Sequence, residues 1–448
     1  MAAVEHVYAY QRASSCDADG LVLATSGGVT ERGLEAHPHF FAGDLDHPQQ
    51  NAAALLTVAR VARTRFYTPP GMVAAAVRAA DPVVTSNVDR LRFESFSADC
   101  GVYSRLDLLP GSLARAMKAS GTTNVDFNPP TRAALAGIGD RGPLHLAVGL
   151  DEVAVSTLAG TAVERRVKLP HRWLKGFAEV QVATANLAPR VELSAVEARR
   201  FLRSLPRSTG RGQTWAVAAG RGLRLTTRPH SGAVCVSGPE RLHFLNVMSR
   251  YCRGLTAYGP PVSDGSPPTA SAWQLQLDDA ALVVVLSPEV RRGFSGEGGV
   301  LTDLADDQAL RDADLLAIHL GWEPDLDPAV LSASSGLGLD RVLRALACLG
   351  GAGRVGFDLA ASSYFHRELP YDSDAIRGMH PRLRDAHALV DAGAVRRVPG
   401  RFEVTTEVTH RVRLDRTPPT CTCQWWGKHQ GQRGPCKHVL AAGLIEGS

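Results

Sequence analysis

The sequence has few cysteines and no long apolar run, and each shortage excludes a class of protein. Eight cysteines in 448 residues are too few for a disulfide framework. The longest apolar runs, such as the one at 281–286, are far shorter than the roughly 20 residues that cross a bilayer. The first residues, MAAVEHVYAYQR, lack the apolar core of a secretory signal. We therefore expect a cytoplasmic protein that does not span a membrane.

Recognised catalytic motifs are also missing. The chain contains no G-x-x-x-x-G-K-[ST], no H-E-x-x-H and no G-x-S-x-G. The glycine-rich run GFSGEGG at 293–299 has no lysine and no nucleotide-binding pattern around it, so we interpret it as a flexible loop. The sequence therefore favours a non-enzymatic protein.

One alternative places an enzyme domain of unrecognised type in residues 1–205. The segment 90–107 concentrates polar and charged residues, among them Arg92, Glu94 and Cys100. A cysteine beside charged groups can act as an activated nucleophile. No histidine lies nearby in the sequence, and a buried structural cysteine explains the same pattern.

A second polar cluster lies in the run HPHFFAGDLDH. Its members are His37, His39, His47, Asp44 and Asp46. These residue types bind metals, but their spacing is irregular, which favours a polar loop.

Charge is distributed unevenly along the chain, whose net charge is +4. Residues 161–230 contain 14 Lys/Arg and 4 Asp/Glu, and residues 381–448 contain 11 and 6. Between them, residues 301–330 contain 1 Arg and 8 Asp/Glu. A basic region can attract phosphate backbones or acidic proteins, and it can equally be an ordinary solvated surface.

The hydrophobic patterns predict an α+β protein of several domains, beginning with a mixed α/β domain of unknown role at 1–205. Ser194 and Glu197 form a capping box at the start of a helix over 193–205. The other expected elements of this domain are a helix at 52–67, two strands within 88–108 joined at Ala98–Cys100, and a hairpin of 144–150 with 153–158.

A second mixed region is expected at 213–320, after a linker at 206–212. Its predicted elements are strands at 214–218, 222–227 and 233–237, a helix at 239–252, and a strand pair around Asp278–Asp279.

Residues 325–372 predict a helix at 328–332, a break, a helix at 339–349 and then two alternating runs, RVGFDL and YFHREL. This order resembles the winged-helix family. The resemblance implies that the second helix contacts DNA through Arg341 and Arg344. Winged helices also serve as protein–protein modules, so both partners stay open.

The last three cysteines cluster near the end of the chain with a histidine. Cys421, Cys423, Cys436 and His438 have the spacing C-x-C-x12-C-x-H. Three thiolates and one imidazole fill the tetrahedron that Zn²⁺ prefers and leave no position open for water. We therefore predict a structural zinc site rather than a catalytic one.

Local structure supports the shared metal. Residues i and i+2 of an extended chain face the same side, and the run KHVLAAGLI predicts a helix that begins at the second ligand pair. A helix N-terminus there stabilises thiolate charge. Lys428, Arg433 and Lys437 are close enough in sequence to offset the negative charge of the site and to contact a partner, and Trp425 and Trp426 can shield it from water.

This signature, with a strand pair before it, resembles the SWIM-type zinc finger over about residues 402–446, within a module expected at 381–448. The resemblance implies binding of nucleic acid, with DNA preferred over RNA, or of a protein. The run VGFDLAASSYFHRELPYD before the finger resembles bacterial SWIM proteins of the kind encoded alongside MoxR-type AAA ATPases and von Willebrand A domain proteins. That resemblance implies an alternative role as an adaptor of such an ATPase.

Overall fold

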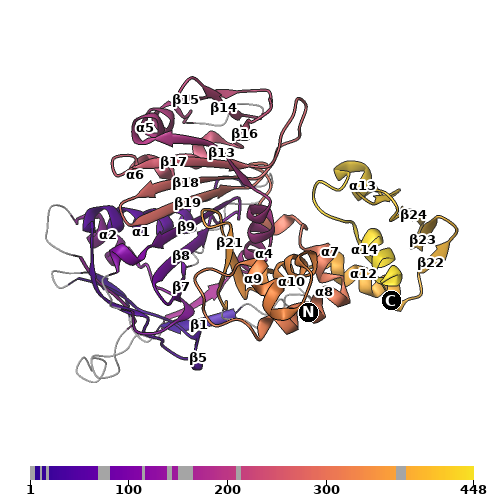
Figure 1. Cartoon of the computed structure of the whole chain (residues 1–448), viewed down its shortest axis with the longest axis horizontal. Helices are drawn as coiled ribbons and strands as arrows, with labels where there is room; N and C mark the ends of the chain where they lie inside the picture. Colours follow the sequence, from indigo (N-terminus) through magenta and orange to yellow (C-terminus); the bar gives the residue numbers. More distant parts are fainter. Residues whose placement is uncertain are drawn as a thin grey trace.

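The computed structural model describes residues 6–10, 13–16, 20–68, 81–113, 117–138, 144–149, 165–207, 213–369 and 380–447. A broad sheet occupies one end of the molecule, a group of helices the middle, and the C-terminal strands and helices the other end (Figure 1). Within these residues, no helix combines the length and the apolar character needed to cross a membrane.

The main feature is one antiparallel sheet of ten strands. In spatial order these are β13 (Ala188–Ser194), β17 (Gly254–Gly259), β18 (Ser271–Leu277), β19 (Ala280–Leu286), β9 (Val102–Leu108), β8 (Arg90–Phe96), β7 (Val83–Asn87), β10 (Gly121–Asn124), β4 (Gly28–Thr30) and β5 (Gly33–Glu35). The predicted strand pairs within 88–108 and around Asp278–Asp279 are confirmed as β8–β9 and β18–β19. Because β19 pairs with β9, the sheet runs across the boundary expected at 206–212.

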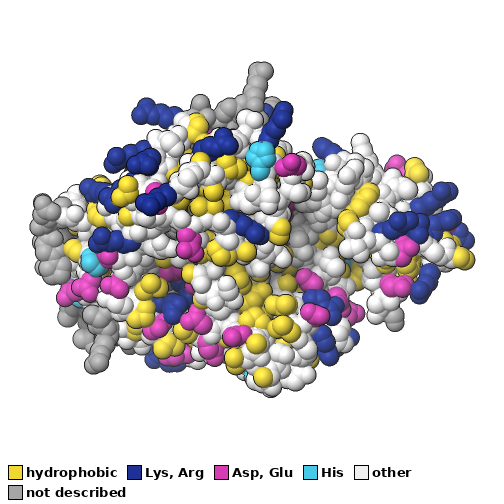
Figure 2. Space-filling model, turned by 45° about the horizontal axis from the view of Figure 1, so that its top comes forward, with side chains coloured by type: hydrophobic (Ala, Val, Ile, Leu, Met, Phe, Trp, Pro, Cys, Tyr) yellow, Lys and Arg dark blue, Asp and Glu magenta, His cyan; other side chains and the backbone are white. Residues whose placement is uncertain are grey.

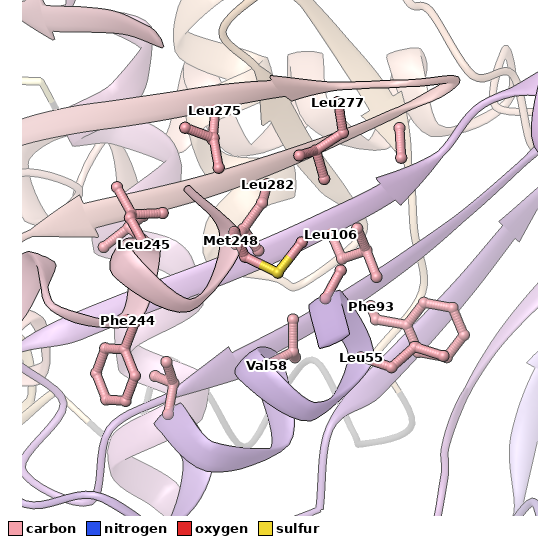
Figure 3. Close-up of a cluster of buried hydrophobic side chains, with 14 of the residues drawn as sticks. Leu55, Val58, Phe93, Leu106, Phe244, Leu245, Met248, Leu275, Leu277 and Leu282 are labelled. Atoms are coloured by element: carbon pink, nitrogen blue, oxygen red, sulfur yellow. The ribbon is translucent and has the colours of Figure 1, made fainter. Parts of the chain in front are cut away.

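The two faces of the sheet are covered by different helices. On one face α1 (Pro48–Arg63), predicted at 52–67, packs with α6 (Phe244–Met248) over leucines and phenylalanines of the central strands (Figure 3). On the other face α4 (His171–Ala185) places Trp173 and Phe177 against Phe96. The alternation of β8 produces this division, because Phe93 points to the first cluster and Phe96 to the second.

Smaller sheets surround the large one. Their strands are β1 (His6–Tyr10) with β12 (Arg165–Leu169); β2 (Ser15–Cys16), β3 (Leu21–Leu23), β11 (Leu144–Val148) and β6 (Phe41–Leu45); and β15 (Gly222–Thr226), β14 (Trp215–Ala219) and β16 (Val234–Cys235). The predicted strand at 144–150 therefore exists and pairs with β3 and β6, whereas its expected partner at 153–158 lies outside the described residues.

Two helices predicted in this half had different outcomes. The capping box of Ser194 and Glu197 is present at α5 (Ala195–Ser204), with both reciprocal hydrogen bonds formed. The helix expected at 239–252 is instead a 3₁₀ turn, η2 (Pro239–Leu242), followed by the short α6. The remaining elements are α2 (Pro129–Ala136) and the 3₁₀ turns η1 (Pro110–Ser112) and η3 (Phe294–Gly296).

The middle of the molecule is a helical layer with one hairpin. It contains α7 (Leu301–Leu304), α8 (Asp307–Ala317), α9 (Pro328–Ser335), α10 (Leu339–Gly351), β20 (Val355–Asp358) and β21 (Ser363–His366). The predicted order of helix, turn, helix and hairpin is present. The unit begins earlier in the chain than predicted, because α8 packs against α10 within the same hydrophobic core.

The hairpin β20–β21 is buried against the large sheet by charged side chains. The Asp358 carboxylate forms ion pairs with Arg92 at 3.2 Å and with Arg105 at 3.3 Å. All three side chains are almost fully buried. Arg367 pairs with Glu94 at 2.6 Å. Burial raises the pKa of Asp358, but the positive charges of Arg105 and Arg92 outweigh burial and hold that pKa well below its usual range.

The C-terminal unit has its own small core. It contains α12 (Pro381–Asp391), a sheet of β22 (Val395–Val398), β23 (Arg401–Thr405), β24 (Thr409–Arg413) and β25 (Thr420–Cys421), and the helices α13 (Gln424–His429) and α14 (Lys437–Glu446). Helix α14 serves two cores: Val439 and Ala442 pack inside this unit, while Leu440 and Ala441 join the core of α7–α10.

Candidate metal centre

The structure brings the four predicted zinc ligands together. The ligand atoms of Cys421, Cys423, Cys436 and His438 all lie within 4.8 Å of one another, and the four side chains are buried. Cys421 ends β25, and Cys423 lies two residues later at the N-terminus of α13. Cys436 is the N-cap of α14, so His438 lies in the first turn of that helix, as the sequence predicted.

The geometry fits a zinc ion. With Zn–S near 2.3 Å and Zn–N near 2.0 Å, a tetrahedral site separates sulfur from nitrogen by about 3.5 Å. The Sγ atom of Cys421 lies 3.8 Å from Nδ1 of His438. The Nε2 atom of His438 points into the protein without a hydrogen-bond partner among the described residues. Nδ1 is therefore the ring nitrogen that faces the thiols.

The contacts among the thiol groups favour one thiolate, at Cys423, and raise the pKa of the Cys421 and Cys436 thiols. Neighbouring thiols of Cys421 and Cys436 donate to the sulfur of Cys423 and hold the pKa of Cys423 far below its ordinary value. The backbone N–H of Trp426 also donates to that sulfur, at 3.4 Å. Because Cys423 and Cys436 each begin a helix, the positive ends of two helices meet at the site.

The loop between the two ligand pairs is docked on the body of the protein. The Arg433 side chain donates to the carbonyl oxygen of Gly296 at 2.6 Å. Arg382, at the start of α12, donates to the carbonyl oxygens of Arg433 and Pro435 at 2.7 and 3.0 Å, and also to that of Glu297. These hydrogen bonds tie the finger to the run 293–299.

Glycines make this contact possible. A Cβ atom on Gly434 would overlap the backbone of Gly298, and Gly434 has a φ of 74°, which favours glycine. Run 293–299, predicted to be a flexible loop, is therefore the surface against which the finger packs. In the sequence, Gly298 and Gly434 are the signal for this close backbone approach. Nothing local to Arg382 indicated its role.

Trp425 and Trp426 lie at the edge of the site and are half-buried. The guanidinium carbons of Arg382 and Arg433 lie 4.8 and 5.2 Å from the centre of the Trp425 ring. The indole therefore packs between the docking arginines as well as beside the ligands. Lys428 is exposed and Lys437 is half-buried, and neither forms an ion pair with a described residue.

The arginines of α10 that were expected to contact DNA are partly exposed and form ion pairs with α8. Arg341 forms two hydrogen bonds with the carboxylate of Asp312, at 2.8 and 2.6 Å, and Arg344 pairs with Asp306 at 2.7 Å. Both acidic residues belong to the start or the body of α8. The acidic segment 301–330 thus neutralises the basic side of the helix expected to read DNA.

The suspected nucleophile Cys100 is an inert, buried thiol. Its side chain is fully buried, and burial raises the pKa of Cys100 to about 12. The charged groups nearest the thiol are Arg172 and Asp99. Other charged residues of the 90–107 segment form ion pairs that fix β20–β21, together with Asp358 and Arg367. This balanced pairing holds structure.

The polar run at 37–47 does not form a metal site. Among the described residues, the Cys₃His group is the only cluster of three or more candidate ligands. His37 contacts the carbonyl oxygen of Thr25 at 3.2 Å, and His47 lies 3.9 Å from Asp279. The side chains therefore separate to different partners, in agreement with the interpretation as a polar loop.

A cleft of about 690 Å³ opens between the finger and α7–α8. Its walls are mostly apolar, with Leu414, Trp426 and Leu444 on the finger side. Acidic residues also line it. They are Asp306, Asp307 and Glu446. No lysine or arginine lines the cleft, although Asp306 and Glu446 are paired with Arg344 and Arg397, which lie outside its lining.

Residues 410–442 match the SWIM zinc finger family. This match contains all four residues of the Cys₃His group, and the buried cluster is consistent with Zn²⁺. No curated protein matches the chain.

Solved structures with partial likeness include the PCNA2–PCNA3 complex of Sulfolobus tokodaii, with a TM-score of 0.32 and 8% identity over 56% of this chain and 99% of that one. Another is Proliferating Cellular Nuclear Antigen from Entamoeba histolytica, with a TM-score of 0.30 and 7% identity over 56% of this chain and 98% of that one. A likeness of this extent carries no conclusion about fold or function.

Proposed function

We propose that this is a recognition protein in which Cys421, Cys423, Cys436 and His438 bind one structural Zn²⁺, and that its finger binds a peptide segment of a protein partner. Four protein ligands leave no coordination position for water or substrate, which argues against a catalytic metal. A closed site of this kind acts through the surface that it holds in place.

The observation that carries the proposal is the cleft beside the finger. Its volume of about 690 Å³ lies within the range of roughly 300–1,000 Å³ that is usual for ligand sites. Surface clefts lined by aromatic and aliphatic side chains usually mark binding sites. The finger supplies one wall and α7–α8 the other, so the cleft depends on the docking of the finger.

Charge selects the kind of partner. Arg344 already pairs with Asp306, and Arg397 pairs with Glu446 at 3.2 Å, but Asp307 is exposed without an ion pair to a described residue. The lining of the cleft therefore offers a phosphate backbone no cation. A peptide that places apolar side chains in the cleft and a lysine or arginine beside Asp307 satisfies both features.

Gly443 of α14 offers a sharp test. It lines the cleft, and a Cβ atom there would meet nothing within 4 Å. Gly443→Trp should therefore fill the cleft without disturbing the fold. Gly443→Ala is the matched control, because it gives a similar gain in helix propensity and leaves the cleft open.

The measurement is selection of a displayed random peptide library on the full chain. We expect peptides that combine large apolar residues with lysine or arginine, bound by the wild-type and Gly443→Ala proteins and lost with Gly443→Trp. Selected peptides that bind Gly443→Trp equally well would overturn the proposal. The resemblance to SWIM proteins encoded beside MoxR-type ATPases makes such an ATPase the first natural partner to test. In that case the chain would act as its adaptor.

A second candidate, nucleic-acid binding by the finger, is supported by its exposed cations. Arg411, Arg416 and Lys428 are exposed and form no ion pair with described residues. Other arginines of the same sheet are paired: Arg396 and Arg401 with Glu403, and Arg413 with Asp415. A salt titration with labelled DNA and RNA tests this candidate, because phosphate contact gives at least non-specific affinity at low salt.

The α8–α10 and β20–β21 unit fits best as a winged-helix-like module that packs within the chain. Its hairpin is buried against the large sheet, and its second helix has its arginines paired. We propose this packing role in place of DNA reading.

A further inference from the structure

The strongest unassigned surface is an arginine-rich face at the opposite end of the molecule from the finger. In Figure 2, dark-blue side chains gather at the upper left, over the part that holds α5 and β15 in Figure 1. Six arginines of this region are exposed: Arg200, Arg203, Arg207, Arg221, Arg224 and Arg228. They come from α5, the residues that follow it, and the β14–β15 hairpin.

These six arginines differ from the paired arginines of α10 and from most arginines of the finger. None of them forms an ion pair with another residue in the part of the chain that the structure describes. On the finger, by contrast, four arginines are matched to Glu403, Asp415 and Glu446. On α10 both arginines are matched to α8. The α5–β15 face thus keeps its positive charge available.

The arginines of the two elements form one surface. Helix α5 packs against β15 through its apolar side, which buries Phe201 and Leu202 and leaves the arginines outside. Hydrogen bonding by Ser194 and then the charges of Arg221 and Arg200 lower the pKa of Glu197. Arg221, in the turn of the hairpin, and Arg200 of the helix therefore both lie within electrostatic range of one carboxylate.

The few acidic groups on this face do not cancel it. Glu197 is held in the capping box, where its carboxylate accepts from the backbone and side chain of Ser194 at 3.1 and 2.7 Å. Glu192 is the other acidic residue of β13 and α5. Six positive charges held close together repel one another and raise the local electrostatic potential. A bound polyanion neutralises these charges and so removes the repulsion.

We propose that the α5–β15 face binds the phosphate backbone of duplex DNA. Arginine is the side chain best suited to phosphate, because its planar guanidinium group donates two parallel hydrogen bonds. Proteins that hold single strands add aromatic side chains on which unpaired bases stack. Here the aromatic residues of α5 and β14, Phe201 and Trp215, are buried, which favours a duplex contacted through its phosphates.

This site is independent of the peptide cleft and of the finger. Both features belong to the other end of the chain, so loss of one interaction leaves the other measurable. It also requires no base-specific contact, and we expect binding to be largely insensitive to sequence.

The test is fluorescence anisotropy of the full chain with a fluorescein-labelled DNA duplex, titrated between about 50 and 200 mM salt. The variant is Arg200→Ala/Arg203→Ala/Arg224→Ala. Each phosphate contact that is lost should reduce the slope of log K against log salt by about 0.9, so three should reduce it by about 2.7. A triple Lys variant at the same positions should keep most of the slope.

The matched control removes three paired arginines of the finger, in Arg396→Ala/Arg401→Ala/Arg413→Ala. We expect this control to leave the slope unchanged, and thermal melts should show that both variants are folded. If the finger control loses DNA binding and the α5–β15 variant does not, the proposal is overturned and DNA binding is assigned to the finger. Absence of DNA binding at low salt, or equal affinity for poly-glutamate, would also overturn it.

Discussion

The Arg433 side chain donates a hydrogen bond to the carbonyl oxygen of Gly296, 137 residues earlier in the chain, at 2.6 Å. A basic residue of the finger loop is thus committed to holding the finger against the body. The same is true of Arg382, which reaches the finger loop and the 293–299 run together. The basic composition of the finger therefore overstates the charge that it can offer to a partner.

Gly434→Ala should loosen this docking. The residue has a φ of 74°, and a Cβ atom there would meet the backbone of Gly298. The left-handed conformation alone costs a non-glycine residue about 1–2 kcal/mol, and the overlap adds to this. We expect faster hydrogen exchange in residues 293–299 and in the 430–435 loop, with the Cys₃His site still able to bind zinc.

Gly427→Ala is the control for this effect. Gly427 lies in α13 of the same finger, and a Cβ atom there would meet nothing within 4 Å. Unchanged hydrogen exchange of the 293–299 run in Gly434→Ala would show that the contact does not dock the finger.

Glu179 should give stability a measurable pH dependence. It is fully buried on α4, accepts a hydrogen bond from the Gly299 N–H at 2.8 Å, and burial raises its pKa from 4.5 to about 7. Because the folded state holds this proton more tightly than the unfolded state does, its contribution is complete below pH 4.5 and is lost as the pH rises to about 7.

Glu179→Gln removes this titration and keeps a hydrogen-bond acceptor. Relative to the wild type, the variant should gain stability as the pH rises, by about 1.4 kcal/mol per pH unit at most. Urea midpoints of both proteins at about pH 5 and about pH 8 measure the difference. Parallel changes in the two proteins would contradict the assignment of a protonated Glu179.

Arg341→Ala should act on stability and leave DNA binding unaltered. The side chain of Asp312 is only 4% exposed, and Arg341 supplies two of its hydrogen bonds. Removing the cation leaves a buried carboxylate partly unsatisfied, at a cost of about 1–3 kcal/mol. Arg311→Ala on α8, the helix of Asp312, removes an exposed arginine that contacts Gln308 and should be nearly neutral. Weaker DNA binding without loss of stability would restore α10 as a reader.

Features encoded by neighbouring residues were the ones that the sequence predicted well. The capping box at Ser194, the strand pair β8–β9 and the four clustered ligands depend on spacings of a few residues. Helix α14 also begins at Cys436, as its sequence indicated.

Features formed by distant residues could not be predicted in this way. The pairing of β19 with β9 joins strands from two expected domains, and no local period encodes which edges meet. The ion pair of Arg92 with Asp358 spans 266 residues. Nothing in the sequence around Arg92 indicated the partner that neutralises it. The buried charges therefore resembled a reactive site in the sequence and are structural in the fold.

Zinc removal tests the central claim most directly. We expect one zinc ion per chain by metal analysis, with loss of zinc in Cys423→Ser and none in Cys16→Ser, whose cysteine lies outside the cluster. Because the finger, the 293–299 run and α12 are linked by hydrogen bonds, chelation should raise hydrogen exchange at 293–299 and 381–391 as well as within the finger, while the ten-stranded sheet stays protected. Unchanged exchange throughout the finger and the 293–299 run after complete removal of zinc would contradict the account.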